Sequence, residues 1–438
     1  MKRYLFACLA IHLYFIAAFA VRAQAPPANP SPSSTIKSIK VAGLQKFPQD
    51  QVIAASGLKA GDVVTAAQIQ DATNTLAALG IFSAVNFRYT SKGSAIDLEF
   101  QVKEAPTYPI SFDNFPWFTG VEIGDAIRAQ VGLFTGEAPD SGTMIDEMTA
   151  VIENLLAAQN IKGSVTHQLI GVPVGDGMEM QFRVEGIPLR VQSVKVDDPI
   201  AADSERLKDR IPDIKSQPYS LFAVELFEFE QVRPLYFSKG FLKAQIGPPQ
   251  TQLVPDRNDP KLTAVEIIIP VHQGAAYAWK GISWQGNMAQ LSATLDSMVE
   301  LKPGDLADGI KIENLWRKIE SDYMQRGYLD FKLDAEPQLD DAAHQVFYRV
   351  TFAEGPQYRM GDMIITGLSV DAEKRLRQAW QIAPGQIFDN NYYESHMAIF
   401  VKPSRDIFGD LPVHYNEFGH LLRRNTDRHI VDVLLDFK

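Results

Sequence analysis

Three histidines and three acidic residues cluster near the C-terminus, where they could form a metal site: His414, His420, His429, Asp410, Glu417 and Asp427. Imidazole and carboxylate groups are ligands that Zn²⁺ accepts in proteins. The spacing contains no His-Glu-x-x-His pattern, and it alternates these side chains across a predicted hairpin instead of gathering them on one helical face. We therefore expect surface histidines on a terminal hairpin, with a metal-dependent hydrolase as the remote alternative.

Other catalytic patterns are missing from the sequence. It contains no Gly-x-Ser-x-Gly elbow and no glycine-rich phosphate loop. The single cysteine, Cys8, lies in an apolar N-terminal run, so a chain cleaved after this run would carry no thiol, no disulfide and no thiolate metal site. We expect a protein that is not an enzyme and that holds no metal and no cofactor.

The composition is that of an ordinary globular protein, with 46% apolar and 22% charged residues. The net charge is −11, and removal of Lys2, Arg3 and Arg22 with a signal segment would change it to −14. Because an acidic surface repels phosphate groups, nucleic acid is not expected as a ligand.

The elements that organise the chain are amphipathic strands that recur. The clearest has apolar residues at every second position: Val346, Tyr348, Val350 and Phe352. It stops at Glu354-Gly355-Pro356, where glycine frees the backbone and proline removes a donor. Similar strands end at Val102, Val184, Val271 and Phe437. The separation of roughly 80 to 87 residues indicates a tandem array of one small module.

The N-terminus resembles a secretory signal. A short basic head precedes an apolar run from Tyr4 to Val21, and small residues suit cleavage after Ala20 or Ala23. We expect a signal peptide over 1–23 and a Pro/Ser-rich linker over 24–34. The alternative is an uncleaved anchor in the inner membrane, which would make the chain an envelope scaffold or a division-type protein.

The first module shows the order of elements most clearly. A strand ending at Gly43 is followed by a helix from about Pro48. A second helix starts at Thr65, with Gln68 completing a capping box, and ends at Gly80. Two strands joined by a turn then lead to Val102. The predicted order is strand, helix, helix, strand, strand.

The remaining modules repeat this order with variable fidelity. We predict an α+β fold: a tandem array of about five small β-α-α-β-β modules, each with two helices on one face of a three-stranded mixed sheet. The predicted domains are listed by residue number: 35–106, 107–188, 189–275, 276–356 and 357–438.

This arrangement resembles the POTRA (polypeptide-transport-associated) domain. The resemblance rests on Leu76-Ala-Ala-Leu-Gly80-Ile81-Phe82 and on strands that end at Glu104-Ala105-Pro106 or Glu354-Gly355-Pro356. Tandem POTRA domains form the periplasmic part of outer-membrane protein assembly factors and of two-partner secretion transporters. Those proteins normally continue into a C-terminal membrane barrel, which needs at least about eight strands. We expect none here, because the last predicted strand closes the fifth module.

The resemblance implies a periplasmic protein that binds polypeptide clients or an assembly partner. Expected partners are unfolded outer-membrane proteins or an outer-membrane assembly or barrel protein, with association to the membrane through these partners. The edge strand of a three-stranded sheet has unused backbone donors and acceptors, so an extended client could add as another strand. The first candidate is the strand over 84–90 with Val85, Phe87 and Tyr89, whose side chains could equally face only the module's own helices.

An aromatic cluster at the start of the second module is a second candidate contact. It comprises Phe112, Phe115, Trp117 and Phe118. We expect this cluster to pack into the core or between modules, or alternatively to leave Phe115, Trp117 and Phe118 as an exposed apolar contact for a client or partner.

Overall fold

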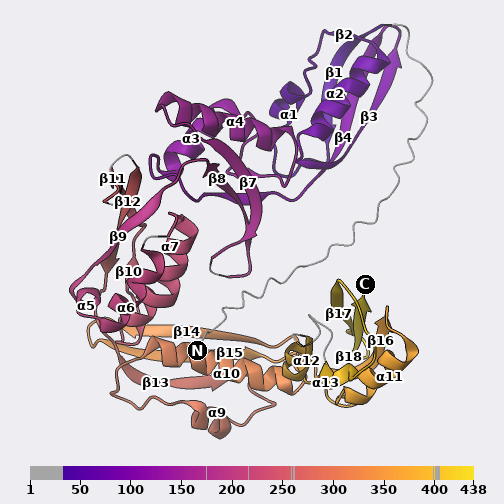
Figure 1. The fold of residues 1–438 in the computed structure, drawn as a ribbon. Coiled ribbons are helices and arrows are strands. Elements are labelled where there is room, and N and C mark those ends of the chain that lie inside the picture. The colour runs from indigo at the N-terminus through magenta and orange to yellow at the C-terminus, as the bar shows by residue number, and fades with distance from the viewer. Residues whose placement is uncertain are drawn as a thin grey trace. The chain divides into compact units, whose positions relative to one another are not determined.

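The computed structural model describes residues 33–173, 175–215, 217–257, 259, 262–397, 399 and 405–438. The predicted signal peptide and almost all of the predicted linker therefore lie outside the described residues. The described chain forms five small sheets, each associated with helices (Figure 1). We number each sheet with its helices as modules 1 to 5.

Module 1 is built on a sheet with the strand order β2-β1-β4-β3. β1 runs parallel to β4, and β3 runs antiparallel to it. The predicted capping box of Thr65 and Gln68 is present at the start of α2. The elements are β1 (Ser34–Ala42), α1 (Gln49–Ala55), β2 (Val63–Val64), α2 (Ala66–Ala78), β3 (Phe82–Lys92) and β4 (Ala95–Glu104).

Module 2 repeats this topology with the strand order β6-β5-β8-β7. Thr119 and Glu122 form a second capping box at the start of α3. The elements are β5 (Tyr108–Phe112), α3 (Gly120–Gln130), β6 (Glu137–Ala138), α4 (Thr143–Ala158), β7 (Ser164–Gly171) and β8 (Met178–Glu185).

Module 3 departs most from the order of elements seen in the other modules. Its second helical segment is interrupted by a π-helical turn, η1, and Pro234 lies just after this turn. The central strand β12 pairs with β9, β10 and β11. The elements are β9 (Arg190–Asp197), α5 (Pro199–Ala202), α6 (Glu205–Ile214), α7 (Leu221–Phe227), η1 (Glu228–Val232), α8 (Arg233–Phe237), β10 (Gln245–Ile246), β11 (Gln250–Pro255) and β12 (Thr263–His272).

Module 4 has a three-stranded sheet in the order β13-β15-β14, and the long helix α10 lies along it (Figure 1). Its buried side chains form one cluster around Trp279, Ile319 and Val350. The elements are β13 (Ala278–Gln285), α9 (Ser292–Met298), α10 (Gly309–Gln325), β14 (Lys332–Asp340) and β15 (Gln345–Ala353).

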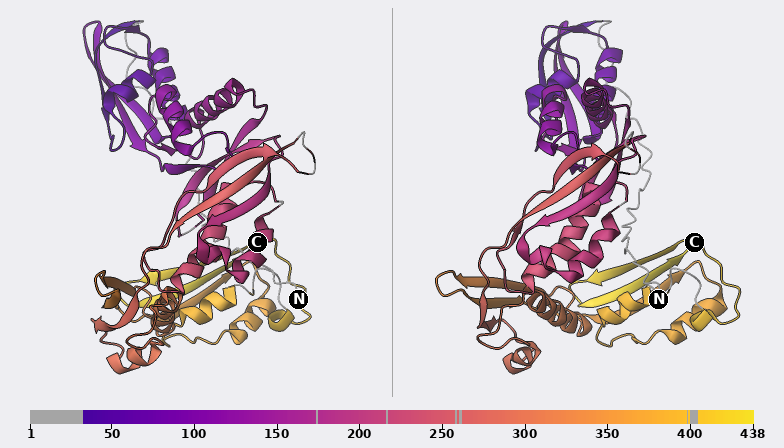
Figure 2. Two further views of the ribbon diagram at one scale, coloured as in Figure 1. Left: turned by 90° about the vertical axis from the view of Figure 1, so that its left-hand side faces the viewer. Right: turned by 60° about the vertical axis from the view of Figure 1, so that its left-hand side comes forward.

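Module 5 has the equivalent order β16-β18-β17. Both views of Figure 2 show its helices on one side of the yellow strands. The elements are β16 (Arg359–Thr366), α11 (Val370–Ala379), α12 (Asn390–Met397), α13 (Arg405–Phe408), β17 (Phe418–Asn425) and β18 (Ile430–Phe437).

The predicted fold class is confirmed, with one addition that periodicity did not indicate. In every module the segment after the inter-helix turn pairs with the start of the first strand. In modules 1 and 2 this pairing forms the short strands β2 and β6. In modules 3 to 5 it is a single bridge, as between Ala278 and Leu306. A segment of two residues is too short to show an alternating pattern.

The described chain divides into two compact units. One contains modules 1 and 2 with most of module 3, and the other contains modules 4 and 5 with Tyr236–Ala244. The predicted domain boundaries stay predictions. Among the described helices, none combines the length and the apolar character needed to span a bilayer.

Candidate functional site

β3 lies at the edge of the module 1 sheet, and within the described residues it pairs only with β4. The register sets Val85, Phe87 and Tyr89 opposite Val102, Phe100 and Leu98 of β4, so these side chains share the face that packs on the helices. All three are half-buried. The rings of Phe87 and Tyr89 stack with centroids 6.5 Å apart. Their side chains therefore anchor the strand, while no strand among the described residues pairs with its outer backbone edge.

The other face of β3 is polar and exposed. Asn86, Arg88 and Thr90 lie on this face, and Arg88 forms an ion pair of 2.8 Å with Glu99 of β4. The hydrogen bond from Arg88 holds the pKa of the Glu99 carboxyl below its ordinary value. This face of β3 is therefore polar and exposed, and it presents no apolar patch.

The aromatic cluster of module 2 is mostly part of the core. Phe115 is only 4% exposed, and its ring packs against Phe112 with centroids 5.8 Å apart. The alternative of an exposed contact is therefore wrong for Phe115. Trp117 and Phe118 are half-buried and pack against the same cluster. The loop after β5 turns these rings inward because the apolar face of β8 lies beneath them, with Phe182 5.8 Å from Phe112.

The glutamates that end the recurring strands have a role that the sequence did not reveal. Glu354 is buried, and its carboxylate accepts hydrogen bonds from the Ala289 amide and from the Tyr323 hydroxyl. Glu104 of module 1 likewise accepts from the amides of Gln45 and Lys46. Each glutamate thus holds the loop between the first strand and the first helix of its own module. The recurrence of Glu before a Gly-Pro or Ala-Pro stop was the available signal.

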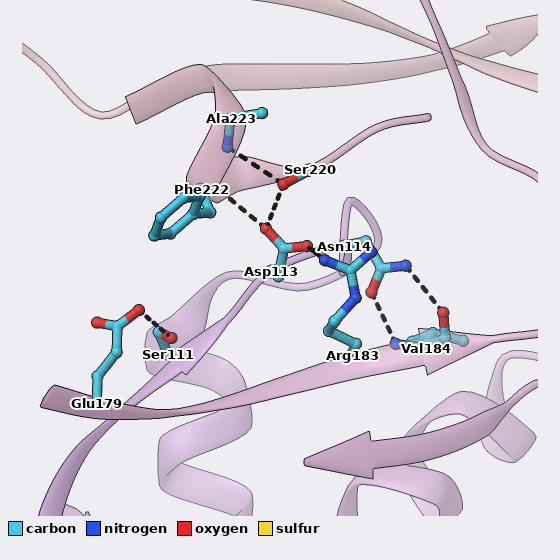
Figure 3. Close-up of polar contacts among 9 residues, drawn as sticks. All are labelled: Ser111, Asp113, Asn114, Glu179, Arg183, Val184, Ser220, Phe222 and Ala223. Atoms are coloured by element: carbon cyan, nitrogen blue, oxygen red, sulfur yellow. Dashed lines mark hydrogen bonds and ion pairs between the residues drawn. The ribbon is translucent and has the colours of Figure 1, made fainter. Parts of the chain in front are cut away.

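A buried carboxylate joins modules 2 and 3 (Figure 3). Asp113 lies after β5, and its Oδ1 accepts from Ser220 Oγ at 2.8 Å and from the Phe222 amide at 2.9 Å. Its Oδ2 pairs with Arg183. Ser220 also caps α7 by accepting from the Ala223 amide at 3.1 Å. Sequence reasoning missed this site, because the partners lie far apart along the chain.

Each of the other three joints also carries a carboxylate that accepts from one cation and one hydroxyl group. These triads are Glu137 with Lys46 and Thr107, Asp341 with Lys243 and Tyr277, and Asp330 with Arg424 and Tyr358. Hydrogen bonds from Lys243 and Tyr277 hold the pKa of Asp341 below its ordinary value. The joints between modules are therefore polar at their rims.

The helix-ending glycines are places where the next module approaches. The Gly240 and Gly327 carbonyls accept from the amides of Tyr277 and Tyr358, both at 2.8 Å, at the start of the following module. A Cβ at Gly327 would lie 2.6 Å from the backbone carbonyl oxygen of Tyr358, and the backbone of Gly327 has φ +82. Glycine is thus required by the joint as well as by the end of the helix.

The C-terminal histidines do not converge on a common point. His429 has φ +51 in the turn between β17 and β18, and His420 lies on β17 with Nδ1 2.6 Å from the Tyr393 hydroxyl. Partial burial lowers the pKa of the His420 imidazole. Within the part of the chain that the structure describes, no three His, Cys, Asp or Glu residues are placed to hold a metal ion.

Fold and site together define a tandem array of small α+β modules, with polar joints and with edge strands that no other described strand covers. The POTRA family model, described as "Surface antigen variable number repeat", matches residues 34–105 and 277–355. Residues 34–105, in module 1, and 277–355, in module 4, therefore each match a POTRA domain.

The curated relatives that match are longer proteins. The outer membrane protein assembly factor BamA of Buchnera aphidicola is 17% identical over 370 residues, which cover 82% of this chain and 58% of the relative. A putative outer membrane protein assembly factor of Treponema pallidum is 20% identical over 47% of this chain. BamA of Neisseria meningitidis is 23% identical over 46% of this chain. The chain spans 58%, 23% and 25% of the lengths of these three relatives.

Among solved structures, POTRA3-5 of Haemophilus influenzae BamA matches 57% of this chain and 96% of that chain. The sequence identity is 21% and the TM-score is 0.44. The N-terminal domain of Omp85 from Thermosynechococcus elongatus matches 74% of this chain and 97% of that chain, with 12% identity and a TM-score of 0.19.

Proposed function

We propose that this chain is a non-enzymatic periplasmic POTRA array in outer-membrane protein biogenesis or secretion, which binds polypeptide clients or an assembly partner by strand addition. The names of the curated relatives, which are outer membrane protein assembly factors, support this role. The proposed partners are unfolded outer-membrane proteins or an outer-membrane assembly or barrel protein. The proposed location follows from the predicted signal peptide, with cleavage after Ala20 or Ala23.

The observation that carries the proposal is the outer edge of β3, with which no strand among the described residues pairs. This strand has 11 residues, and all its described ladder partners lie on β4. An extended segment that joins the free side needs no particular sequence, because it pairs with backbone groups. Each added hydrogen bond contributes about 1 kcal/mol net, so one edge binds weakly and releases easily. Several edges in one chain raise the effective concentration of a bound client.

The edge strand of module 4 is less suited to this role. β14 is the edge of module 4, but it contains Pro337, which lacks a backbone donor, and four charged residues: Lys332, Asp334, Glu336 and Asp340. Proline and charges on an edge strand hinder strand addition. β3 contains no proline, and its apolar side chains Val85, Phe87 and Tyr89 face inward. β3 is therefore a better candidate for client binding than β14.

Site-specific photocrosslinking of the full chain in its native envelope tests this proposal. The photoreactive amino acid replaces Asn86 on β3 in one variant and Gln101 on β4 in the other. These two exposed residues are direct partners in the register, so they lie on the same face of the sheet. They differ in that Asn86 is on the edge strand and Gln101 is on a strand inside the sheet. We expect crosslinks to outer-membrane proteins or assembly components from Asn86 and few from Gln101.

Equal crosslinking from the two positions would exclude strand addition at β3. Crosslinks from Asn86 to proteins unrelated to the outer membrane would leave the edge as a binding site but contradict the role in assembly.

A further inference from the structure

Asp113 lies at the joint between modules 2 and 3, and its side chain is 0% exposed. Three groups of module 3 face it: the Ser220 hydroxyl and Phe222 amide bond the carboxylate, and the Leu221 amide bonds the Asp113 carbonyl oxygen at 2.9 Å. Arg183 of module 2 supplies the balancing charge. A buried carboxylate is costly unless it is paired and hydrogen-bonded, so these contacts stabilise the joint as a set.

Module 2 holds Asp113 firmly on the other side. The Asp113 amide donates to the Phe182 carbonyl at 3.0 Å. The neighbouring Asn114 pairs with the Val184 backbone in both directions, at 2.7 and 2.8 Å. Both contacts tie the loop after β5 to β8. The carboxylate is therefore a fixed part of module 2 that reaches into module 3.

The other joints have apolar clusters that cross them. One cluster runs through modules 1 and 2, with members from Ile36 to Ile187. Leu242 packs against the cluster of module 4, and Leu329 belongs to the cluster of module 5. The carboxylates at these three joints are more exposed. The exposed fraction of the side chain is 32% for Glu137, 67% for Asp341 and 41% for Asp330. Their ion pairs are accordingly screened by water and salt.

We propose that Asp113 is a clasp that locks modules 2 and 3 into one rigid body. The clasp depends on Asp113, Arg183 and Ser220 together. Removal of any one of these three side chains leaves buried polar groups without a partner. We therefore expect the loss of one side chain to let modules 2 and 3 move relative to each other, and not only to weaken the joint slightly. The clasp keeps the edge strands β7 and β11 in a fixed relation to each other.

Distance measurement between spin labels tests the clasp in the full chain. Replacing the single cysteine by Cys8→Ser allows labels to be attached at Glu147→Cys on α4 and Asp209→Cys on α6, both exposed positions. We expect one narrow distance distribution between the two labels. Asp113→Ala should broaden it at least about twofold and raise hydrogen exchange at the Leu221 and Phe222 amides about tenfold.

Asp341→Ala in the same labelled background is the matched control, since it removes an exposed joint carboxylate elsewhere and should leave the distribution narrow. Ser220→Ala gives a second test if Asp113→Ala fails to fold, because it removes the donor of module 3 and leaves module 2 complete. A broad distribution in the parent chain, or a narrow one in folded Asp113→Ala and Ser220→Ala, would overturn the proposal.

Discussion

Glu354 and Ala289 are joined by a short contact in module 4, in which both carboxylate oxygens of Glu354 face the Ala289 amide, at 2.9 and 3.1 Å. The Tyr323 hydroxyl donates to the same carboxylate at 2.7 Å. One buried acidic side chain therefore connects the end of β15, the loop before α9 and the helix α10. This contact explains why the strand stop contains glutamate as well as glycine and proline.

Removal of this carboxylate should destabilise module 4. We expect Glu354→Ala to lower the free energy of unfolding by about 2–3 kcal/mol, because the Ala289 amide and the Tyr323 hydroxyl lose a charged acceptor. Denaturant unfolding measures the loss, and hydrogen exchange at the Ala289 amide locates it. Tyr323→Phe, which removes one hydroxyl group, should cost less than Glu354→Ala. Equal stability of Glu354→Ala and the parent chain would show that the contact is not needed.

Glycine at the end of α2 should be more important than glycine at the end of α1. A Cβ at Gly80 would overlap the Ser141 carbonyl oxygen of module 2, and the backbone has φ +88. Gly57 has a similar φ of +74, but a Cβ there meets nothing within 4 Å. We expect Gly57→Ala to cost about 1–2 kcal/mol from backbone strain alone. Gly80→Ala should cost clearly more, because the joint must also shift.

Thermal unfolding of the two variants tests this comparison. Similar melting temperatures for Gly80→Ala and Gly57→Ala would mean that the backbone at Ser141 of module 2 can move away from the added Cβ with no loss of stability. Loss of the joint in Gly80→Ala would also appear as easier proteolysis between modules 1 and 2.

Glu228 should make the stability of module 3 depend on pH. Burial and the nearby Glu225 raise the pKa of Glu228 from its ordinary 4.5 to about 7, and its Oε1 is buried with no hydrogen-bond partner among the described residues. The folded state therefore binds the proton more tightly than the unfolded state. This favourable contribution is complete below the unfolded pKa of 4.5 and is lost as the pH rises to about 7.

Glu228→Gln should remove this pH dependence. We expect the variant to be more stable than the parent by about 1–2 kcal/mol at about pH 8, and equally stable at about pH 4. Denaturant unfolding at the two pH values checks the difference. Glu230→Gln, at an exposed position of the same turn, is the control and should change little. A gain that is the same at both pH values would point to packing instead of ionisation.

Edge and core positions of module 1 should respond differently to truncation. Phe100 is fully buried on β4, whereas Phe87 opposite it on β3 is half-buried. We expect Phe100→Ala to cost about 3–5 kcal/mol and Phe87→Ala distinctly less. Unfolding of module 1 measures both. A larger loss of unfolding free energy for Phe87→Ala than for Phe100→Ala would contradict this expectation. It would mean that the packing of β3 contributes more to stability than the packing of the central strand β4.

Several features could be predicted from the sequence because they depend on local periodicity. The alternating apolar residues of β15 and the capping box at Thr65 are each confirmed. The order of elements in each module follows from such signals, and five repetitions make the pattern unambiguous. The alternative that Phe115 forms an exposed contact is wrong, because local periodicity does not decide the direction of a loop side chain. An aromatic residue in a loop can turn inward or outward, and the neighbouring strand decides which.

The sequence alone determined the repeat, the α+β module and the resemblance to POTRA domains, since these depend on the spacing of apolar residues and glycines. Only the tertiary structure decided that Asp113 meets Ser220, that Glu354 meets Ala289 and that Val85, Phe87 and Tyr89 face inward from an edge strand of the described sheet. These contacts join residues far apart along the chain. No local pattern specifies them, because they exist only once the sheets have formed and neighbouring modules have packed together.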